Sequence, residues 1–100
     1  MTARFHVADT ENGQFRDDPD HDTLLALTSG LNNSDNTFLT VNPADESSAW
    51  YGSVSLLQDG HYEVELADPD HHEHKVTTHT DQATATKTLS RWLATHQHPR

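Results

Sequence analysis

The chain has 100 residues, no cysteine, and sixteen acidic side chains against six basic ones, which leaves a formal net charge of -10. A negative field of this size repels nucleic acid and anionic lipid and attracts basic protein surfaces. The lack of cysteine excludes a disulfide framework and thiolate zinc sites. The length allows one domain, expected to span residues 1–100 with 97–100 as a flexible tail, and no apolar run approaches the roughly 20 residues of a membrane helix.

The first third of the chain predicts a strand, a polar connection and a helix. Residues 4–8 alternate polar and apolar side chains, as in a half-buried strand. A turn at Asn12-Gly13 follows, and we expect Phe15 to anchor the next polar stretch to the core. Asp18 is expected to cap a helix that begins at Pro19. Gly30 is expected to end this helix. The residues that repeat at helical spacing and form its buried face are Leu24, Leu27, Thr28 and Leu31.

The middle of the chain predicts a strand at 36–42, closed by Pro43, and then a hairpin between residues 49 and 67. A two-residue Asp59-Gly60 loop would place Glu63 and Glu65 on the apolar face of the hairpin. A three-residue loop, 58–60, with Gly60 in the left-handed region avoids this. One face is then entirely apolar: Trp50, Gly52, Val54, Leu56, Tyr62, Val64 and Leu66. Because a one-residue slip reverses every side chain, the pattern favours the longer loop.

The last third predicts a turn at 68–70, a strand at 73–79 with Val76 inward, and a closing helix. Thr80 or Asp81 caps this helix, which runs to about His96. Its apolar face carries Ala85, Leu89, Trp92 and Leu93. The elements together predict a two-layer α+β domain, with an antiparallel sheet of four to five strands and both helices packed on one face.

Nothing in the sequence favours catalysis. The chain has no cysteine nucleophile and no Gly-x-Ser-x-Gly elbow, and its four glycines are isolated rather than gathered in a phosphate-binding loop. We therefore expect a protein that is not an enzyme. No apolar segment follows Met1, so a cytoplasmic protein is the expectation.

A histidine-rich run at 71–74 contains the candidate metal ligands. Imidazole nitrogens suit zinc, copper or nickel, and in a strand His72 and His74 would project to one side. The run lacks the spacing of an established metal motif. We therefore expect no physiological metal and no other cofactor, and the ligands to test are His71, His72 and His74.

The polar face of the predicted hairpin is the candidate partner-binding surface. It carries Tyr51, Leu57, His61, Glu63 and Glu65. Aromatic side chains supply contact energy, while carboxylates steer a basic partner and pair with its Arg or Lys. A second acidic cluster adds to this surface: Asp17, Asp18, Asp20 and Asp22. Asp20 and Asp22 also complement the positive N-terminal end of the predicted helix.

Five segments follow one another from Asp20 onward: 20–27 in the first helix, F-L-T-V at 38–41, W-Y-G-S-V at 50–54, G-H-Y-E-V-E-L at 60–66 and L-S-R-W-L at 89–93. In this order they resemble the Imm1-type immunity proteins. Members of that family occur in bacterial polymorphic-toxin loci and neutralise a co-encoded toxin, often a nuclease or deaminase, by binding it. The resemblance implies an immunity or antitoxin protein that occludes a basic toxin domain, and it transfers no individual functional residue.

Two alternatives stay open. A phage- or plasmid-encoded inhibitor of a host nucleic-acid enzyme would use the same acidic mimicry. A small regulatory domain would instead bind a ligand or a metal and need no protein partner. For an inhibitor of either origin, the expected partner is a basic protein, and neither nucleic acid nor a membrane is expected to bind.

Overall fold

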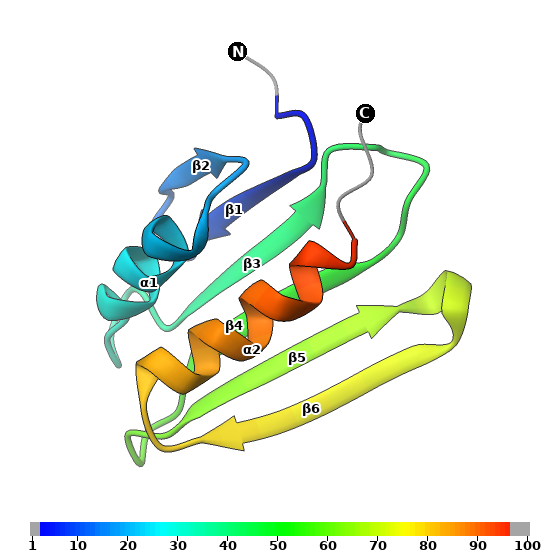
Figure 1. Cartoon of the computed structure of the whole chain (residues 1–100). Coiled ribbons are helices and arrows are strands. Elements are labelled where there is room, and N and C mark those ends of the chain that lie inside the picture. Colours follow the sequence, from blue (N-terminus) through cyan, green and yellow to red (C-terminus); the bar gives the residue numbers. More distant parts are fainter. Residues whose placement is uncertain (1–2, 97–100) are drawn as a thin grey trace.

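The computed structural model describes residues 3–96, in which two helices cover one face of a six-stranded antiparallel sheet (Figure 1). The elements are β1 His6–Thr10, β2 Phe15–Asp17, α1 His21–Ser29, β3 Phe38–Pro43, β4 Tyr51–Leu56, β5 Tyr62–Asp68, the short 3-10 helix η1 Pro69–His71, β6 Glu73–His79 and α2 Gln82–Ala94. The strand order is β2-β1-β3-β4-β5-β6. The predicted α+β class and the packing of both helices on one face are confirmed, with six strands in place of four to five. The expected tail at 97–100 lies outside the described residues.

The core lies between the sheet and the two helices. Leu39, Val54 and Val64 from the sheet are completely buried, as is Leu89 of α2, because their side chains all point into this layer. The Trp50 and Trp92 rings meet edge to face, 5.6 Å apart. Among the described residues, no helix is long and apolar enough to span a membrane.

The β4–β5 hairpin has the register that the apolar pattern predicts. Val54 pairs with Val64, and Leu56 pairs with Tyr62. Gly60 has a φ of +90°, as a bulged three-residue loop requires. The β5–β6 pairing then continues from Tyr62–His79 to Asp68–Glu73, so β6 covers the whole length of β5.

Both helices begin at an aspartate cap. The Asp81 side chain accepts a hydrogen bond from the Thr84 amide at the start of α2, as predicted. The expected start of α1 is wrong by two residues: the cap is Asp20, which accepts from the Thr23 amide, and the helix begins at His21. Asp18 has a φ of +47° and uses its carboxylate elsewhere, so it cannot serve as the cap.

Two apolar side chains predicted to point inward point outward. Phe15 lies in the short strand β2, which the sequence did not predict, and pairs with Asp9 of β1 on the face away from the helices. Its side chain is 64% exposed. Val76 pairs with Glu65 and is 49% exposed. In both cases the pairing with the neighbouring strand decides which face a residue occupies, and a single apolar residue in an edge strand does not overrule it.

Helix α2 crosses the sheet over Gly52. A Cβ atom at this position would lie 2.6 Å from Cδ1 of Leu89, closer than atoms in contact can approach. Leu89 is itself fully buried in the core, so its side chain can move away only if its neighbours repack.

We expect Gly52→Val to destabilise the fold by about 1–3 kcal/mol, because the added side chain overpacks the layer between β4 and α2. The matched control is Ser53→Val, one residue along the same strand but on the opposite face. Chemical denaturation measures both. Equal stability of the Gly52→Val variant and the natural chain would contradict this close packing.

Candidate functional site

The face of the sheet opposite the helices is uncovered by any described element, and we call it the open face. Its members follow from the strand pairing, because directly paired residues in antiparallel strands point to the same side. The strand residues on it are Val7, Asp9, Phe15, Asp17, Phe38, Thr40, Asn42, Tyr51, Ser53, Ser55, Glu63, Glu65, Ala67, His74, Val76 and Thr78.

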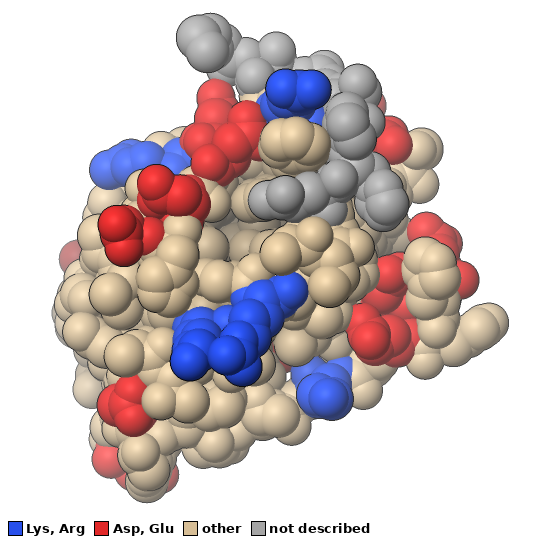
Figure 2. Space-filling model, in the orientation of Figure 1, with Lys and Arg blue, Asp and Glu red and all other residues tan. Residues whose placement is uncertain are grey.

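The charged strand residues differ between the two faces, because only the helix side carries Lys and Arg. The open-face strand residues include four carboxylates, those of Asp9, Asp17, Glu63 and Glu65. They include neither Lys nor Arg. The basic strand residues, Arg16 and Lys75, pair with core residues and point to the helix side. On that side, Figure 2 shows basic side chains across α2, with acidic ones toward the rim. The open face is therefore purely acidic among its formally charged strand residues.

The exposed large apolar side chains lie on the same face. Phe15, Phe38 and Val76 are the exposed large hydrophobic residues of the described chain. Phe15 pairs with Asp9, Phe38 with Ser55 and Val76 with Glu65, so all three belong to the open face. They lie on β2, β3 and β6, so they are spread from one edge strand of the sheet to the other, and singly exposed apolar residues of this kind are ordinary.

A hydrogen-bonded group lies within the open face. The Tyr51 hydroxyl donates to Oε2 of Glu65 at 3.1 Å, and Nε2 of His74 lies 2.7 Å from the same oxygen. The bond to Glu65 is the main cause of a raised pKa for Tyr51, with burial and the charge of Glu65 adding to it. The predicted residues Tyr51, Glu63 and Glu65 thus share one surface. Sequence reasoning did not assign Asp9, Phe15, Phe38 or His74 to it.

The other two predicted hairpin residues lie beside the loop at its end. Leu57 donates its backbone amide to the His61 carbonyl at 2.8 Å, and both residues are half-buried. Nδ1 of His61 lies 2.9 Å from a carboxylate oxygen of Asp59. These residues close the hairpin and are not part of the strand surface.

The structure divides the predicted acidic cluster at 17–22 among different roles. Asp18 accepts backbone hydrogen bonds from Arg4, Phe5 and His6, which hold the start of β1 beside the end of β2. Burial raises the pKa of Asp18, but these three bonds lower it by more, so it lies below its usual value. Asp20 caps α1, and only Asp17 belongs to the open face.

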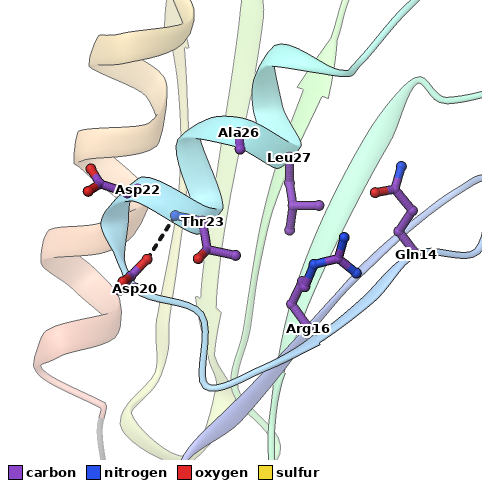
Figure 3. Close-up of a pocket in the computed structure, with 7 residues that line it drawn as sticks. All are labelled: Gln14, Arg16, Asp20, Asp22, Thr23, Ala26 and Leu27. Atoms are coloured by element: carbon purple, nitrogen blue, oxygen red, sulfur yellow. Dashed lines mark hydrogen bonds between the residues drawn. The ribbon is translucent and has the colours of Figure 1, made fainter.

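A hollow of about 410 Å³ lies between α1 and β2, and the remaining member of the acidic cluster, Asp22, lines it. Figure 3 shows Arg16 extending from β2 beneath α1, while Asp20 and Asp22 lie at the N-terminal end of the helix. The guanidinium group of Arg16 donates to the Phe15 carbonyl at 2.7 Å. The polar groups of this hollow do not converge on one point, so it has no defined ligand geometry.

A smaller hollow of about 280 Å³ is bordered by His6. The His6 ring is buried, and neither ring nitrogen has a hydrogen-bond partner among the described residues. Burial lowers its pKa, opposed in part by the Pro19 carbonyl and the charge of Asp18. The ring packs edge-on against Trp50 with centroids 6.3 Å apart. His6 is thus a packing residue of the core.

The three histidines considered as metal ligands do not come together. His72 follows η1 with a φ of +53°, in the left-handed region, so it does not share an extended strand with His74. His74 lies on the open face, and Nδ1 of His71 lies 2.8 Å from the Asp68 carboxylate. A different set is close enough to share an ion: the ligand atoms of Asp68, Glu73 and His96 all lie within 4.8 Å of one another.

Comparison with known proteins finds no protein-family model, curated protein or solved structure that matches the chain. The resemblance to Imm1-type immunity proteins therefore stays a prediction.

The hydrogen bonds of Asp18 predict a specific pH dependence of stability. Because the folded-state pKa lies below the usual 3.8, the stabilisation is fully present above that value and is lost as the pH falls through the folded pKa. Asp18→Asn, which tolerates the left-handed backbone, should cost about 1 kcal/mol at pH 7 and lose less further stability between pH 5 and 2 than the natural chain does. Urea denaturation across this range measures it. Asp17→Asn is the control, and parallel pH curves for all three proteins would contradict the assignment.

Proposed function

We propose that the chain is an immunity-type binding protein that occludes a basic protein domain with its open face and performs no chemistry itself. One observation carries this proposal: the strand residues of the open face hold four carboxylates and no Lys or Arg, together with all three exposed large apolar side chains of the described chain. Charge complementarity selects a basic partner, and the apolar groups supply contact area.

The mechanism is occlusion. A toxin that acts on nucleic acid holds its anionic substrate with Lys and Arg, and the open-face carboxylates are suited to occupy that region in the substrate's place. Long-range attraction by the net charge accelerates encounter, while the buried aromatic contacts set the dissociation rate. The resemblance to Imm1-type proteins makes a co-encoded toxin domain the first partner to test. An inhibitor of a host nucleic-acid enzyme would use the same surface, and the identity of the captured protein separates the two.

The first experiment is affinity capture from the native host lysate at low and high salt, with mass spectrometry of the bound proteins. The natural chain should retain one basic protein in stoichiometric amount, and its binding should abolish that protein's activity on nucleic acid. Capture should fail with Asp17→Lys/Glu63→Lys, which reverses two charges on the open face.

With the partner purified, we expect Asp17→Lys/Glu63→Lys to slow association about tenfold or more at low salt. The difference should disappear near 1 M salt, where the screening length falls to about 3 Å. Stopped-flow mixing measures the rates. The matched control is Asp22→Lys/Asp70→Lys, which changes the net charge equally at exposed positions outside the sheet. Equal slowing by both double variants would contradict the assignment of the open face, because only total charge would then matter.

The apolar part of the surface predicts a separate effect on dissociation. Because Phe15 is 64% exposed, Phe15→Ser should change the free energy of unfolding by no more than about 0.5 kcal/mol. In the complex it should raise the dissociation rate about tenfold or more and leave association nearly unchanged. Surface plasmon resonance measures both rates. An unchanged dissociation rate would place Phe15 outside the interface.

A further inference from the structure

A cluster of metal-ligating side chains lies on the helix side of the sheet, where β5 and β6 are joined. Asp68 ends β5 and pairs directly with Glu73, the first residue of β6, and η1 connects them. His96 follows the C-terminal end of α2, and its Nε2 lies 2.9 Å from Oδ2 of Asp68. Segments far apart in the sequence thus bring two carboxylates and an imidazole to one point, within 4.8 Å of one another.

Asp68 is unusual because its carboxylate is buried. The residue is 3% exposed, and its position continues the inward-facing series of Val64 and Leu66 along β5. Among the described residues its side-chain hydrogen-bond partners are two imidazoles, His71 at 2.8 Å and His96 at 2.9 Å, and both contact the same oxygen, Oδ2. Burial of a carboxylate is costly unless it is paired and hydrogen-bonded.

The geometry around His96 orients Nε2 as a ligand. The Thr95 hydroxyl donates to the Trp92 carbonyl at 2.6 Å, and Nδ1 of His96 lies 2.8 Å from that hydroxyl oxygen and 2.9 Å from the same carbonyl. Because the carbonyl can only accept, the tautomer with its proton on Nδ1 satisfies this contact. In that tautomer the lone pair of Nε2 faces Oδ2 of Asp68 at 2.9 Å, and one metal ion could accept electron density from both atoms.

Neighbouring side chains hold the other ligands in place. The indole Nε1 of Trp92 donates to Oε1 of Glu73 at 2.7 Å. The His96 ring stacks on Trp92 with centroids 3.8 Å apart and also contacts Trp50, which restricts its rotation. A carbonyl partner for the second ring nitrogen and a donor to the carboxylate are the outer-shell contacts that metal ligands usually make.

We propose that Asp68, Glu73 and His96 bind a zinc ion, with His71 as the fourth ligand. Two imidazole nitrogens and two carboxylate oxygens form a donor set that zinc accepts in tetrahedral geometry, whereas calcium and magnesium prefer oxygen alone. A hollow of about 250 Å³, lined by these four residues and Thr95, gives access to the cluster. The His71 side chain is 78% exposed and already contacts Asp68, so it can adjust toward the ion at little cost.

Zinc binding can be tested without the partner, because the metal ligands and the open face lie on opposite sides of the sheet. The test is calorimetric titration of the full chain with zinc chloride. One equivalent should bind in a saturable manner, and zinc at a hundred times Kd should raise the melting temperature by about 10 °C or more.

Substitutions at exposed ligands distinguish this site from the many other surface histidines. Glu73→Gln keeps an acceptor for Trp92, and both Glu73→Gln and His71→Gln change exposed residues, so both variants should fold. Each should weaken zinc binding about tenfold or more. The matched controls on the open face, Glu63→Gln and His74→Gln, should bind zinc within about twofold of the natural chain.

Three results would overturn the proposal. The first is the absence of saturable zinc binding. The second is an equal loss of affinity in the open-face controls, which would show adventitious binding by surface histidines. The third is full retention of affinity in both Glu73→Gln and His71→Gln. Melting curves of every variant without zinc confirm that it is folded before the titrations are compared.

Discussion

The register of the β4–β5 hairpin is the constraint from which the rest of the structure follows. In a strand, successive side chains alternate between faces, so a shift of one residue would exchange the core and the open face completely. The bulged loop at Gly60 prevents this shift by pairing Val54 with Val64. With that pairing, the apolar set faces the helices, and Glu63 and Glu65 face outward. The acidic surface and the buried core are thus two consequences of one loop.

The same alternation explains why Asp68 is buried. Counting outward from Val64, every second residue of β5 faces the helices, and Asp68 is the last of this series. A carboxylate at a core position contradicts the local preference for apolar residues, and such contradictions are expected at functional or strained sites. Here His96, at the end of α2, and His71, in η1, converge on the Asp68 carboxylate. The cost of burying this carboxylate is reduced by its contacts with these two imidazoles, and a bound metal ion would reduce it further.

Most of the fold could be predicted because strong local signals agreed with one another. The hairpin register, the Asp81 cap and the inward face of α2 each depend on patterns within a dozen residues. The misassigned residues depended on pairing with distant segments. Phe15 faces outward because β2 pairs with β1, and Val76 faces outward because β6 takes its register from Asp68–Glu73. Neither pairing has a local signature in the sequence.

The candidate sites show the same division between local and distant signals. The hairpin carboxylates were predictable because alternation along one strand places them together. Asp18 was assigned to the binding surface because it belongs to a run of acidic residues. Its carboxylate instead accepts hydrogen bonds from three backbone amides at the start of the first strand. The cluster of Asp68, Glu73 and His96 could not be predicted from spacing, since His96 is separated from Asp68 by all of β6 and α2. Only the tertiary arrangement brings these ligands together.

The two proposed sites meet physically in strand β6. This strand forms one edge of the sheet, and most of its side chains are exposed, so few apolar contacts of its own hold it in place. Its first residue, Glu73, is tied to Trp92 of α2 and lies in the proposed zinc site. Its alternate residues, His74 and Val76, face the other way and belong to the open face. An ion bound at Glu73 would therefore hold in place the same strand that presents His74 and Val76 to a partner. Zinc would then favour partner binding by ordering the edge of the surface beforehand, without contacting the partner itself.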